Sequence, residues 1–113
     1  MQIPNADRAV IDPAKLHGYL LSRSHPVGRF KAAFFLALGY SPEDWRRLEA
    51  DLRSQHLSKA AAPEEGTSYG QKYTIRATLV GPSGQSAEVV SVWVVRRGET
   101  FPRFVTAYPE GER

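Results

Sequence analysis

Hydrophobic positions in the first half of the chain recur every three or four residues, which predicts amphipathic helices. Asp12-Pro13 predicts a helix start, because a carboxylate can cap a helix and proline suits its first position, and this helix ends near Ser22. A second helix is predicted from Val27-Gly28 to Gly39, and a third after Ser41-Pro42. The predicted buried stripes are Leu16, Tyr19 and Leu20, then Phe30, Phe34, Ala37 and Leu38, then Trp45, Leu48 and Leu52.

In the second half the hydrophobic period changes to two, which is typical of strands. Residues 73–80 alternate, and residues 87–95 are apolar on both faces, which indicates a central strand. The glycine-rich segment 81–84 and the segment 96–99 are predicted turns, and residues 101–108 form the next strand. A fourth strand begins at Ser68-Tyr69, or these residues extend the first one.

These elements predict an α+β fold in which about three N-terminal helices pack on one face of a C-terminal antiparallel meander of three to four strands. We expect one domain over residues 1–113, with a helical half at about 12–57, a loop at about 58–67 and a sheet at about 68–109. Trp45 and Trp93 are both expected to be largely buried. The face of the sheet without helices is either a partner or substrate surface or is covered by side chains of the long loop.

The composition of the chain excludes several classes of functional site. The chain has 113 residues, 42% of them hydrophobic, and no cysteine, so disulfides, thiolate metal sites and a thiol nucleophile are excluded. No apolar run approaches the ~18 residues that a membrane span needs, and the first residues do not resemble a signal peptide. A cytoplasmic location is therefore the default expectation, although a domain cut from a larger exported toxin would look the same.

The positive charge of the chain is concentrated in the predicted sheet half. The net charge is +3 and the isoelectric point is about 9.4, which alone is a mild basic bias. Between residues 67 and 109 the charged side chains are Lys72, Arg76, Arg96, Arg97 and Arg103 against Glu88 and Glu99. The sheet is therefore expected to supply much of any basic surface.

The densest group of chemically useful side chains is the segment 25–31. It lies at a predicted helix start, where free N–H groups and the helix dipole favour an anion. His25 brings an imidazole that titrates near neutral pH, Gly28 would let a ligand approach the backbone, and Arg29 and Lys31 add positive charge. This is a candidate phosphate-binding and acid–base site. The alternative, favoured by the local pattern alone, is that His25 is a surface turn residue and the two basic side chains are solvated.

The other histidines have structural explanations. His17 is expected on the exposed side of the first helix, and His56 at the end of the third helix, where a cation suits the helix dipole. The three histidines lack the spacing of a metal site, and no carboxylate cluster joins them, so no metal or cofactor is expected. Arg103 and Thr106 have opposite parity in the last strand, so only a bulge or a long reach would let both meet one ligand.

Five motifs in order along nearly the whole chain resemble an uncharacterised bacterial domain family, which is similar to the ribonuclease toxins of the barnase–EndoU–colicin–RelE superfamily. The motifs are Lys15-x-x-x-Tyr19-Leu20-Leu21, His25-Pro26-x-Gly28-x-x-Lys31-Ala32-x-Phe34-Phe35-x-x-Leu38-Gly39-Tyr40, Tyr69-Gly70-x-Lys72-Tyr73, Val92-Trp93, and Pro102-Arg103-x-Val105-Thr106-Ala107-Tyr108-Pro109. The superfamily fold, N-terminal helices followed by an antiparallel sheet, is similar to the one predicted here.

The resemblance implies RNA cleavage without a metal or other cofactor, through 2′-OH attack that leaves a 2′,3′-cyclic phosphate. The implied catalytic residues are His25 as general base or acid, Lys31 and Arg103 as charge stabilisers, and Thr106 as a donor to a phosphate oxygen. The residues assigned to substrate binding are Arg29, Lys15, Lys72, Arg76 and Tyr108. An acidic protein that neutralises the toxin is the implied partner. The alternative is a non-catalytic interaction module that docks a protein on the exposed sheet face.

Overall fold

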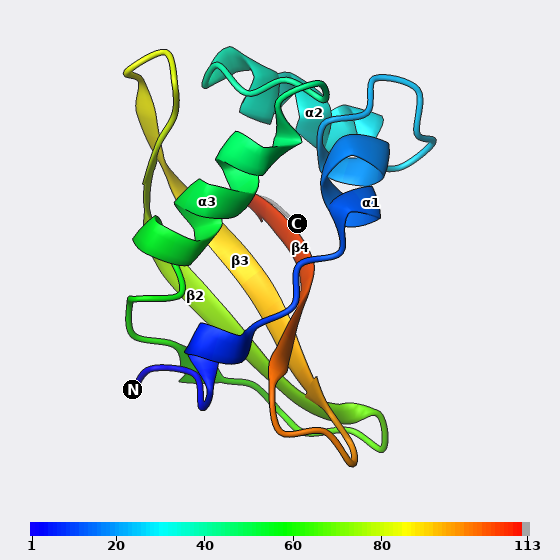
Figure 1. The fold of residues 1–113 in the computed structure, drawn as a ribbon, viewed down its shortest axis with the longest axis vertical. Coiled ribbons are helices and arrows are strands. Elements are labelled where there is room, and N and C mark those ends of the chain that lie inside the picture. The colour runs from blue at the N-terminus through cyan, green and yellow to red at the C-terminus, as the bar shows by residue number, and fades with distance from the viewer. Residues whose placement is uncertain (112–113) are drawn as a thin grey trace.

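The helical segments precede the strands along the chain, and α3 lies across one face of the sheet (Figure 1). The computed structural model describes residues 1–111, apart from the side chain of Phe30. Its elements are the short 3-10 helix η1 (Ala6–Arg8), α1 (Pro13–Lys15), the π-helical turn η2 (Leu16–Leu20), α2 (Arg29–Ala37), α3 (Trp45–Gln55), β1 (Ala62–Pro63), β2 (Gly70–Val80), β3 (Ser86–Arg96) and β4 (Pro102–Pro109). The predicted α+β architecture is confirmed.

The helix boundaries are set by local capping contacts that the sequence predicts. The Asp12 carboxylate accepts a hydrogen bond from the Ala14 N–H at 2.9 Å, as the predicted cap of α1. Gly39 adopts a φ of 102° after α2, a left-handed conformation that suits glycine and ends the helix. The Ser41 hydroxyl accepts from the Asp44 N–H, which fixes the turn that leads into α3.

The sheet has the order β1-β2-β3-β4, with antiparallel pairing throughout. The strand β1 lies in the segment 58–67, which the sequence predicts as a loop. It is part of the sheet because Ala62 and Pro63 pair with Thr74 and Tyr73 of β2. Proline has no N–H to donate, so this short strand suits the outer edge of the sheet. The segment 68–69 precedes β2 and does not form a separate strand.

One face of the sheet, called here the helix face, forms the core with the helices. Its buried side chains include Ile75, Leu79, Val89, Trp93, Phe104 and Ala107, and they form one cluster with Leu48 and Leu52 of α3. Trp93 is fully buried as predicted, whereas Trp45 is only half-buried because it lies at the start of α3, beside the exposed His17 ring.

The buried stripe of α2 agrees with the prediction at Leu38 and differs from it at Ala32, Phe35 and Ala37. Ala32, Phe35 and Leu38 are buried, Phe34 is half-buried and Ala37 is exposed, while the side chain of Phe30 lies outside the described residues. Apolar residues occur on several sides of this helix, so the period alone did not decide which side would pack.

The other face, called here the open face, includes three rows that cross β2, β3 and β4, because directly paired residues point to the same side of a sheet. The rows are Lys72–Val94–Arg103, Thr74–Val92–Thr106 and Arg76–Val90–Tyr108. Val90 and Val94 are buried although they are not part of the helix-side core, whereas Val92, between two threonines, is half-buried. We infer that the longer side chains of the outer rows shield the two buried valines.

A β-bulge in β4 explains why Arg103 and Thr106 share the open face. Val92 pairs with Thr106, but Trp93 pairs with Phe104, so Val105 is an extra residue without a partner in β3. The extra residue reverses the parity of the strand. Of the two alternatives that the sequence left open, a bulge or a long reach of Arg103, the bulge is present.

Candidate functional site

The ammonium group of Lys31 lies between two hydroxyl groups from distant parts of the chain. Its Nζ donates to the Tyr19 hydroxyl oxygen at 2.9 Å and to the Thr106 Oγ1 at 3.0 Å. The Thr106 hydroxyl in turn donates to the Tyr19 oxygen at 3.4 Å. All three side chains are half-buried. This Lys31 cluster (Tyr19, Lys31 and Thr106) holds a cation at the edge of the open face, where solvent can still reach it.

Close packing between η2 and the start of α2 brings Tyr19 to Lys31. Gly28 is buried, and a Cβ at that position would lie 2.1 Å from the Tyr19 carbonyl oxygen. Gly28 therefore serves the approach of the chain to itself, whereas the sequence suggested the approach of a ligand. Tyr108, one row from Thr106 on the open face, lies with its ring centroid 5.9 Å from the Lys31 Nζ.

His25 caps the turn before α2 instead of leaving it open to an anion. Its Nδ1 accepts hydrogen bonds from the N–H groups of Val27 and Gly28 at 3.0 and 2.9 Å, and its carbonyl accepts from Arg29. Because Nδ1 is an acceptor, the neutral ring carries its proton on Nε2. The ring also contacts the Tyr19 ring, with centroids 5.1 Å apart. This geometry disfavours proton abstraction by His25 and favours donation of a hydrogen bond through Nε2.

Tyr19 belongs to the cluster but was predicted only as a member of a buried stripe. Burial raises the pKa of its hydroxyl, but the hydrogen bonds from Lys31 and Thr106 and the charges of Lys31 and Lys15 outweigh burial, so its pKa is lowered overall. The Tyr19 hydroxyl therefore loses its proton more readily than an ordinary tyrosine does. No local sequence signal gave this contact, because Tyr19, Lys31 and Thr106 come from three separate elements.

Arg103 lies away from the Lys31 cluster, in a neighbouring groove on the same face. Its guanidinium forms a two-bond pair with Glu99, with N···O distances of 2.9 and 3.0 Å, and this pairing lowers the pKa of the Glu99 carboxyl. The groove has a volume of about 390 Å³. It is lined by Lys15, Thr67, Tyr69, Lys72, Val94, Arg96, Arg103, Phe104 and Val105.

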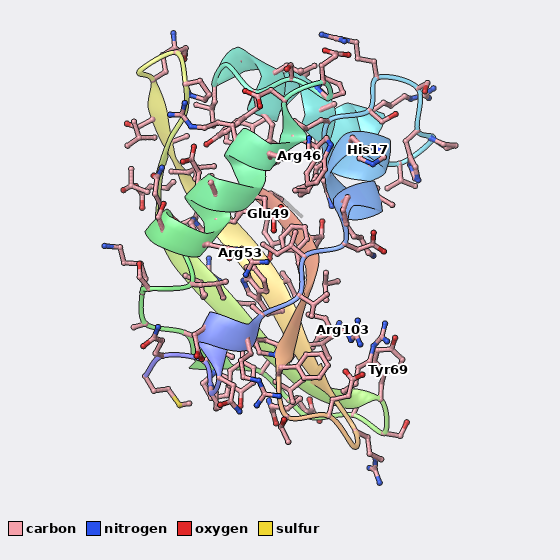
Figure 2. The ribbon with its side chains drawn as sticks, viewed as in Figure 1. His17, Arg46, Glu49, Arg53, Tyr69 and Arg103 are labelled. Carbon is pink, nitrogen blue, oxygen red and sulfur yellow. The ribbon has the colours of Figure 1, made fainter. Side chains whose placement is uncertain are left out.

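This basic groove gathers two more of the residues predicted to bind substrate, Lys15 and Lys72, from α1 and β2. Tyr69 and Arg103 lie close together at the end of the sheet away from α2 (Figure 2). Sequence reasoning assigned no role to Tyr69 or Arg96 at the site, although the exposed tyrosine beside basic residues was a weak signal for base stacking. The charge of Lys15 also acts on Tyr19, which links the groove to the Lys31 cluster.

The remaining predicted residues, Arg76 and Arg29, belong neither to the Lys31 cluster nor to the lining of the basic groove. Arg76 is on the open face but forms an exposed ion pair with Glu110 at 3.3 Å. Arg29 is the first residue of α2 and is exposed. The predicted site residues thus divide into the Lys31 cluster with Tyr108, the His25 turn, the basic groove with Arg103, and these two peripheral arginines.

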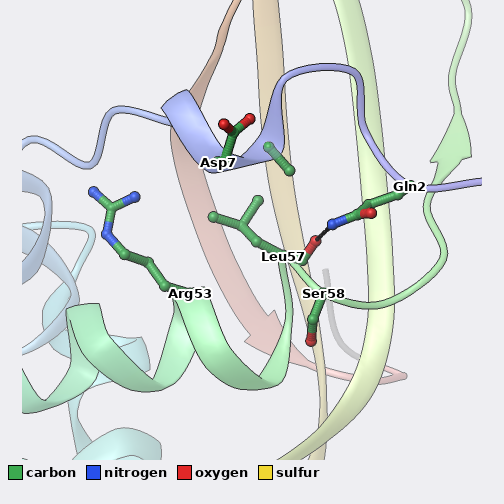
Figure 3. Close-up of a pocket in the computed structure, with 6 residues that line it drawn as sticks. Gln2, Asp7, Arg53, Leu57 and Ser58 are labelled. Atoms are coloured by element: carbon green, nitrogen blue, oxygen red, sulfur yellow. Dashed lines mark hydrogen bonds between the residues drawn. The ribbon is translucent and has the colours of Figure 1, made fainter.

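A second hollow, between η1 and the end of α3, has a structural explanation (Figure 3). Its volume is about 190 Å³. The Arg53 guanidinium in its wall already binds the Glu49 carboxylate and the Ala9 carbonyl, and the Gln2 amide donates to the Leu57 carbonyl. The Arg53 and Gln2 side chains of its lining are therefore already engaged within the protein.

His56 is a buried, neutral group, which corrects the expectation of a cation at the end of α3. It is fully buried between the end of α3 and the helix face of the sheet, and its Nδ1 shares a 2.7 Å hydrogen bond with the Ser91 hydroxyl, to which the Trp93 indole also donates. Burial lowers the pKa of His56, although the Ala77 backbone and the Glu88 charge oppose this shift. This His56 cluster (His56, Ser91 and Trp93) is part of the core.

Two further findings concern the described residues as a whole. Between residues 1 and 111, no three histidine, aspartate or glutamate side chains come together as metal ligands would. Over the same residues, the helices are too short and too polar for any of them to cross a lipid bilayer.

Comparison with known proteins gives the family and a fold relative. The family model described as "Domain of unknown function (DUF6883)" matches residues 2–111, so the chain belongs to that family. A chain of the contact-dependent growth inhibition toxin–immunity protein complex from Klebsiella pneumoniae 342 has a similar fold, with a TM-score of 0.54 and 19% sequence identity over 95% of this chain and 97% of that chain. No curated protein matches the sequence. Membership of a family of unknown function agrees with the resemblance, while similarity to ribonuclease toxins remains a prediction.

Proposed function

We propose that this member of the DUF6883 family is a metal-independent endoribonuclease toxin. The observation that carries the proposal is the Lys31 ammonium, held by Tyr19 and Thr106 at the edge of a sheet face that also bears the basic groove. A half-buried cation beside hydroxyl groups suits a phosphodiester, because it can stabilise negative charge that grows during the reaction. The fold relative comes from a toxin–immunity protein complex, which agrees with a toxin role.

The reaction would use the substrate's own 2′-OH as nucleophile. The 2′ oxygen attacks the adjacent phosphorus, the bond from phosphorus to the 5′ oxygen breaks, and the products are a 2′,3′-cyclic phosphate and a 5′-OH end. Lys31 stabilises the extra charge on the phosphorane, and Thr106 donates a hydrogen bond to a phosphate oxygen. Arg103 acts from the groove on the neighbouring phosphate, because it lies outside the cluster.

Proton transfer is assigned to Tyr19 in preference to His25. The Tyr19 oxygen, with its lowered pKa, accepts the 2′-OH proton as a phenolate, and the departing 5′ oxygen takes a proton from water. His25, with Nδ1 occupied by two backbone donors, contributes a hydrogen bond from Nε2. Both residues remain catalytic candidates, with different expected effects on the pH profile.

A toxin of this kind would act in the cytoplasm, where RNA is found, and would need a neutralising protein. The unpaired cations of the basic groove make an acidic partner the best match, because opposite charges speed encounter and favour specific docking. Such a partner would cover the groove and the Lys31 cluster together.

The direct test is cleavage of RNA by the purified protein in excess EDTA. We expect RNA to be cut to 2′,3′-cyclic phosphate ends, while DNA and RNA with a 2′-O-methyl group at the cleavage position stay intact. Cleavage of DNA, or complete inhibition by EDTA, would contradict this mechanism. In cells, expression of the wild-type chain should arrest growth, and Lys31→Met should not. The matched control is Lys59→Met, an exposed lysine just beyond α3, which should still arrest growth.

The alternative is a non-catalytic module that docks a protein on the open face. The two buried valines on that face reduce its apolar surface, so such docking would rely on charge. A protein that cuts no RNA or DNA, yet binds an acidic partner through Lys72 and Arg96, would favour this alternative.

A further inference from the structure

The floor and walls of the basic groove combine three strands with two other segments. The row Lys72–Val94–Arg103 forms its floor, Lys15 reaches in from α1, and Tyr69 stands at its side just before β2. Its volume of about 390 Å³ lies in the range of small-ligand sites. The groove adjoins the Lys31 cluster, since Val105 lines it and Thr106 is the next residue.

The charges in the groove are not balanced within the protein. Within the part of the chain that the structure describes, Lys15, Lys72 and Arg96 form no ion pair, so of these four groove cations Arg103 alone has a carboxylate partner. Like charges held together repel one another and lower the stability of the fold. A bound anion would therefore stabilise the fold by reducing this repulsion. Several phosphates or carboxylates would meet this requirement.

The position of Tyr69 indicates which of these anions suits the groove. It is 61% exposed, and the Arg96 guanidinium lies 5.9 Å from its ring centroid. Its N–H donates to the Thr67 hydroxyl, and its carbonyl accepts from the Arg97 N–H, so its backbone is anchored on both sides. An exposed, anchored aromatic ring beside an arginine is a platform on which a nucleobase stacks.

We propose that the basic groove binds the nucleotide of single-stranded RNA next to the reacting phosphate, with its base stacked on Tyr69 and its phosphate held by Lys15, Lys72 and Arg96. This inference rests on the proposed function and assigns a substrate subsite to it. An acidic protein could neutralise the same cations, but the aromatic wall and the cavity volume fit a nucleoside better than a carboxylate side chain. Recognition by stacking tolerates any base, so the groove would favour single strands over a duplex.

The test measures binding without cleavage, so that it is independent of catalysis. A 5′-labelled RNA hexamer, fully 2′-O-methylated and therefore uncleavable, is titrated with wild-type protein and followed by fluorescence anisotropy. Tyr69→Ala should weaken binding about 5- to 150-fold, whereas Tyr69→Phe, which keeps the ring, should bind like the wild type. Lys72→Ala should reduce the slope of log affinity against log salt by about one, and Lys59→Ala should leave it unchanged.

The outcomes separate this inference from the proposed function. Equal binding by Tyr69→Ala and the wild type, or no binding of the hexamer by the wild type, overturns the subsite. Binding of poly-glutamate that depends on Lys72 and displaces the hexamer, while Tyr69→Ala has no effect on either ligand, assigns the groove to an acidic protein and also overturns it. Loss of affinity in Tyr69→Ala by a protein that cleaves no RNA supports the subsite and contradicts the nuclease.

Discussion

The His56 cluster and the Lys31 cluster are both triads of hydrogen-bonded side chains that join a helical segment to the sheet, but they differ in charge and in access to solvent. The His56 cluster contains neutral groups and is sealed beneath α3. The Lys31 cluster holds a cation and is half-buried at the edge of the open face. A sealed neutral triad can only stabilise, whereas an accessible charged one can also bind. The comparison predicts that substitutions will affect stability in the first cluster and activity in the second.

The largest expected effect is on stability, from Trp93 in the sealed cluster. Trp93→Ala removes a fully buried ring and should lower the free energy of unfolding by about 3–5 kcal/mol, measured by chemical denaturation. Any protein that still folds should retain wild-type activity per folded molecule. A loss below about 1 kcal/mol would contradict this placement of Trp93 in the core.

Lys31 should show the opposite pattern. Lys31→Met removes the ammonium while keeping most of the side-chain volume, and should lower kcat for RNA cleavage by about 10²–10³-fold. Its unfolding free energy should stay within about 1 kcal/mol of the wild type, because only two hydrogen bonds to half-buried partners are lost. A variant with normal cleavage would remove Lys31 from the mechanism.

Ser91 joins both partners of the sealed cluster through one oxygen. Ser91→Ala leaves the His56 Nδ1 and the Trp93 indole N–H without partners in the core, and should cost about 1–3 kcal/mol of stability in urea denaturation. Ser86→Ala, at an exposed position at the start of the same strand, is the matched control and should be nearly neutral. Equal effects of the two substitutions would mean that the buried bonds contribute nothing.

Tyr19 should have a smaller effect than Lys31, and one that depends on pH. Tyr19→Phe keeps the ring but removes the oxygen whose pKa is lowered, so cleavage should fall about 10²-fold, at the low end of the range expected for Lys31, and lose the rise with pH that ionisation of Tyr19 produces. His25→Ala should leave that rise in place. A pH profile that is unchanged in Tyr19→Phe and lost in His25→Ala would reverse the two assignments.

The pH dependence of stability should report on the sealed cluster. Burial holds the pKa of His56 below its ordinary 6.5, so the unfolded chain takes up a proton first as the pH falls. The free energy of unfolding should therefore decrease as the pH drops below about 6.5. His56→Gln should flatten this part of the curve, and His17→Gln, at an exposed site, should not. Equal slopes for all three proteins would show that His56 does not set the acid limit.

Local chemistry made the order of elements predictable, but not the contacts between them. Element boundaries can be predicted where a side chain or a backbone conformation acts within a few residues, as at Asp12, at Gly39 and in the glycine-rich turn at 81–84. The strand at Ala62–Pro63 was missed because only its pairing with β2 makes it a strand. Such pairing depends on residues ten and twelve positions away.

The candidate site shows the same limit at the level of single side chains. Lys31 and Thr106 could be named from the resemblance, but Tyr19 was read as a core residue, because the approach of η2 to Gly28 is a tertiary feature. The place of His56 at a helix end predicts a cation there, whereas burial lowers its pKa and favours the neutral ring. In each case a local preference gave way to packing.

The unpaired Val105 also bears on how this surface can change during evolution. Deletion of its single codon would leave Arg103 and Thr106 two positions apart, so regular pairing in β4 would keep both on the open face and remove only the bulge. If regular pairing instead ran on through Val105, Thr106 would turn to the helix face and the groove and the Lys31 cluster would no longer share a face. The bulge thus lets the strand carry one extra residue without separating the two features.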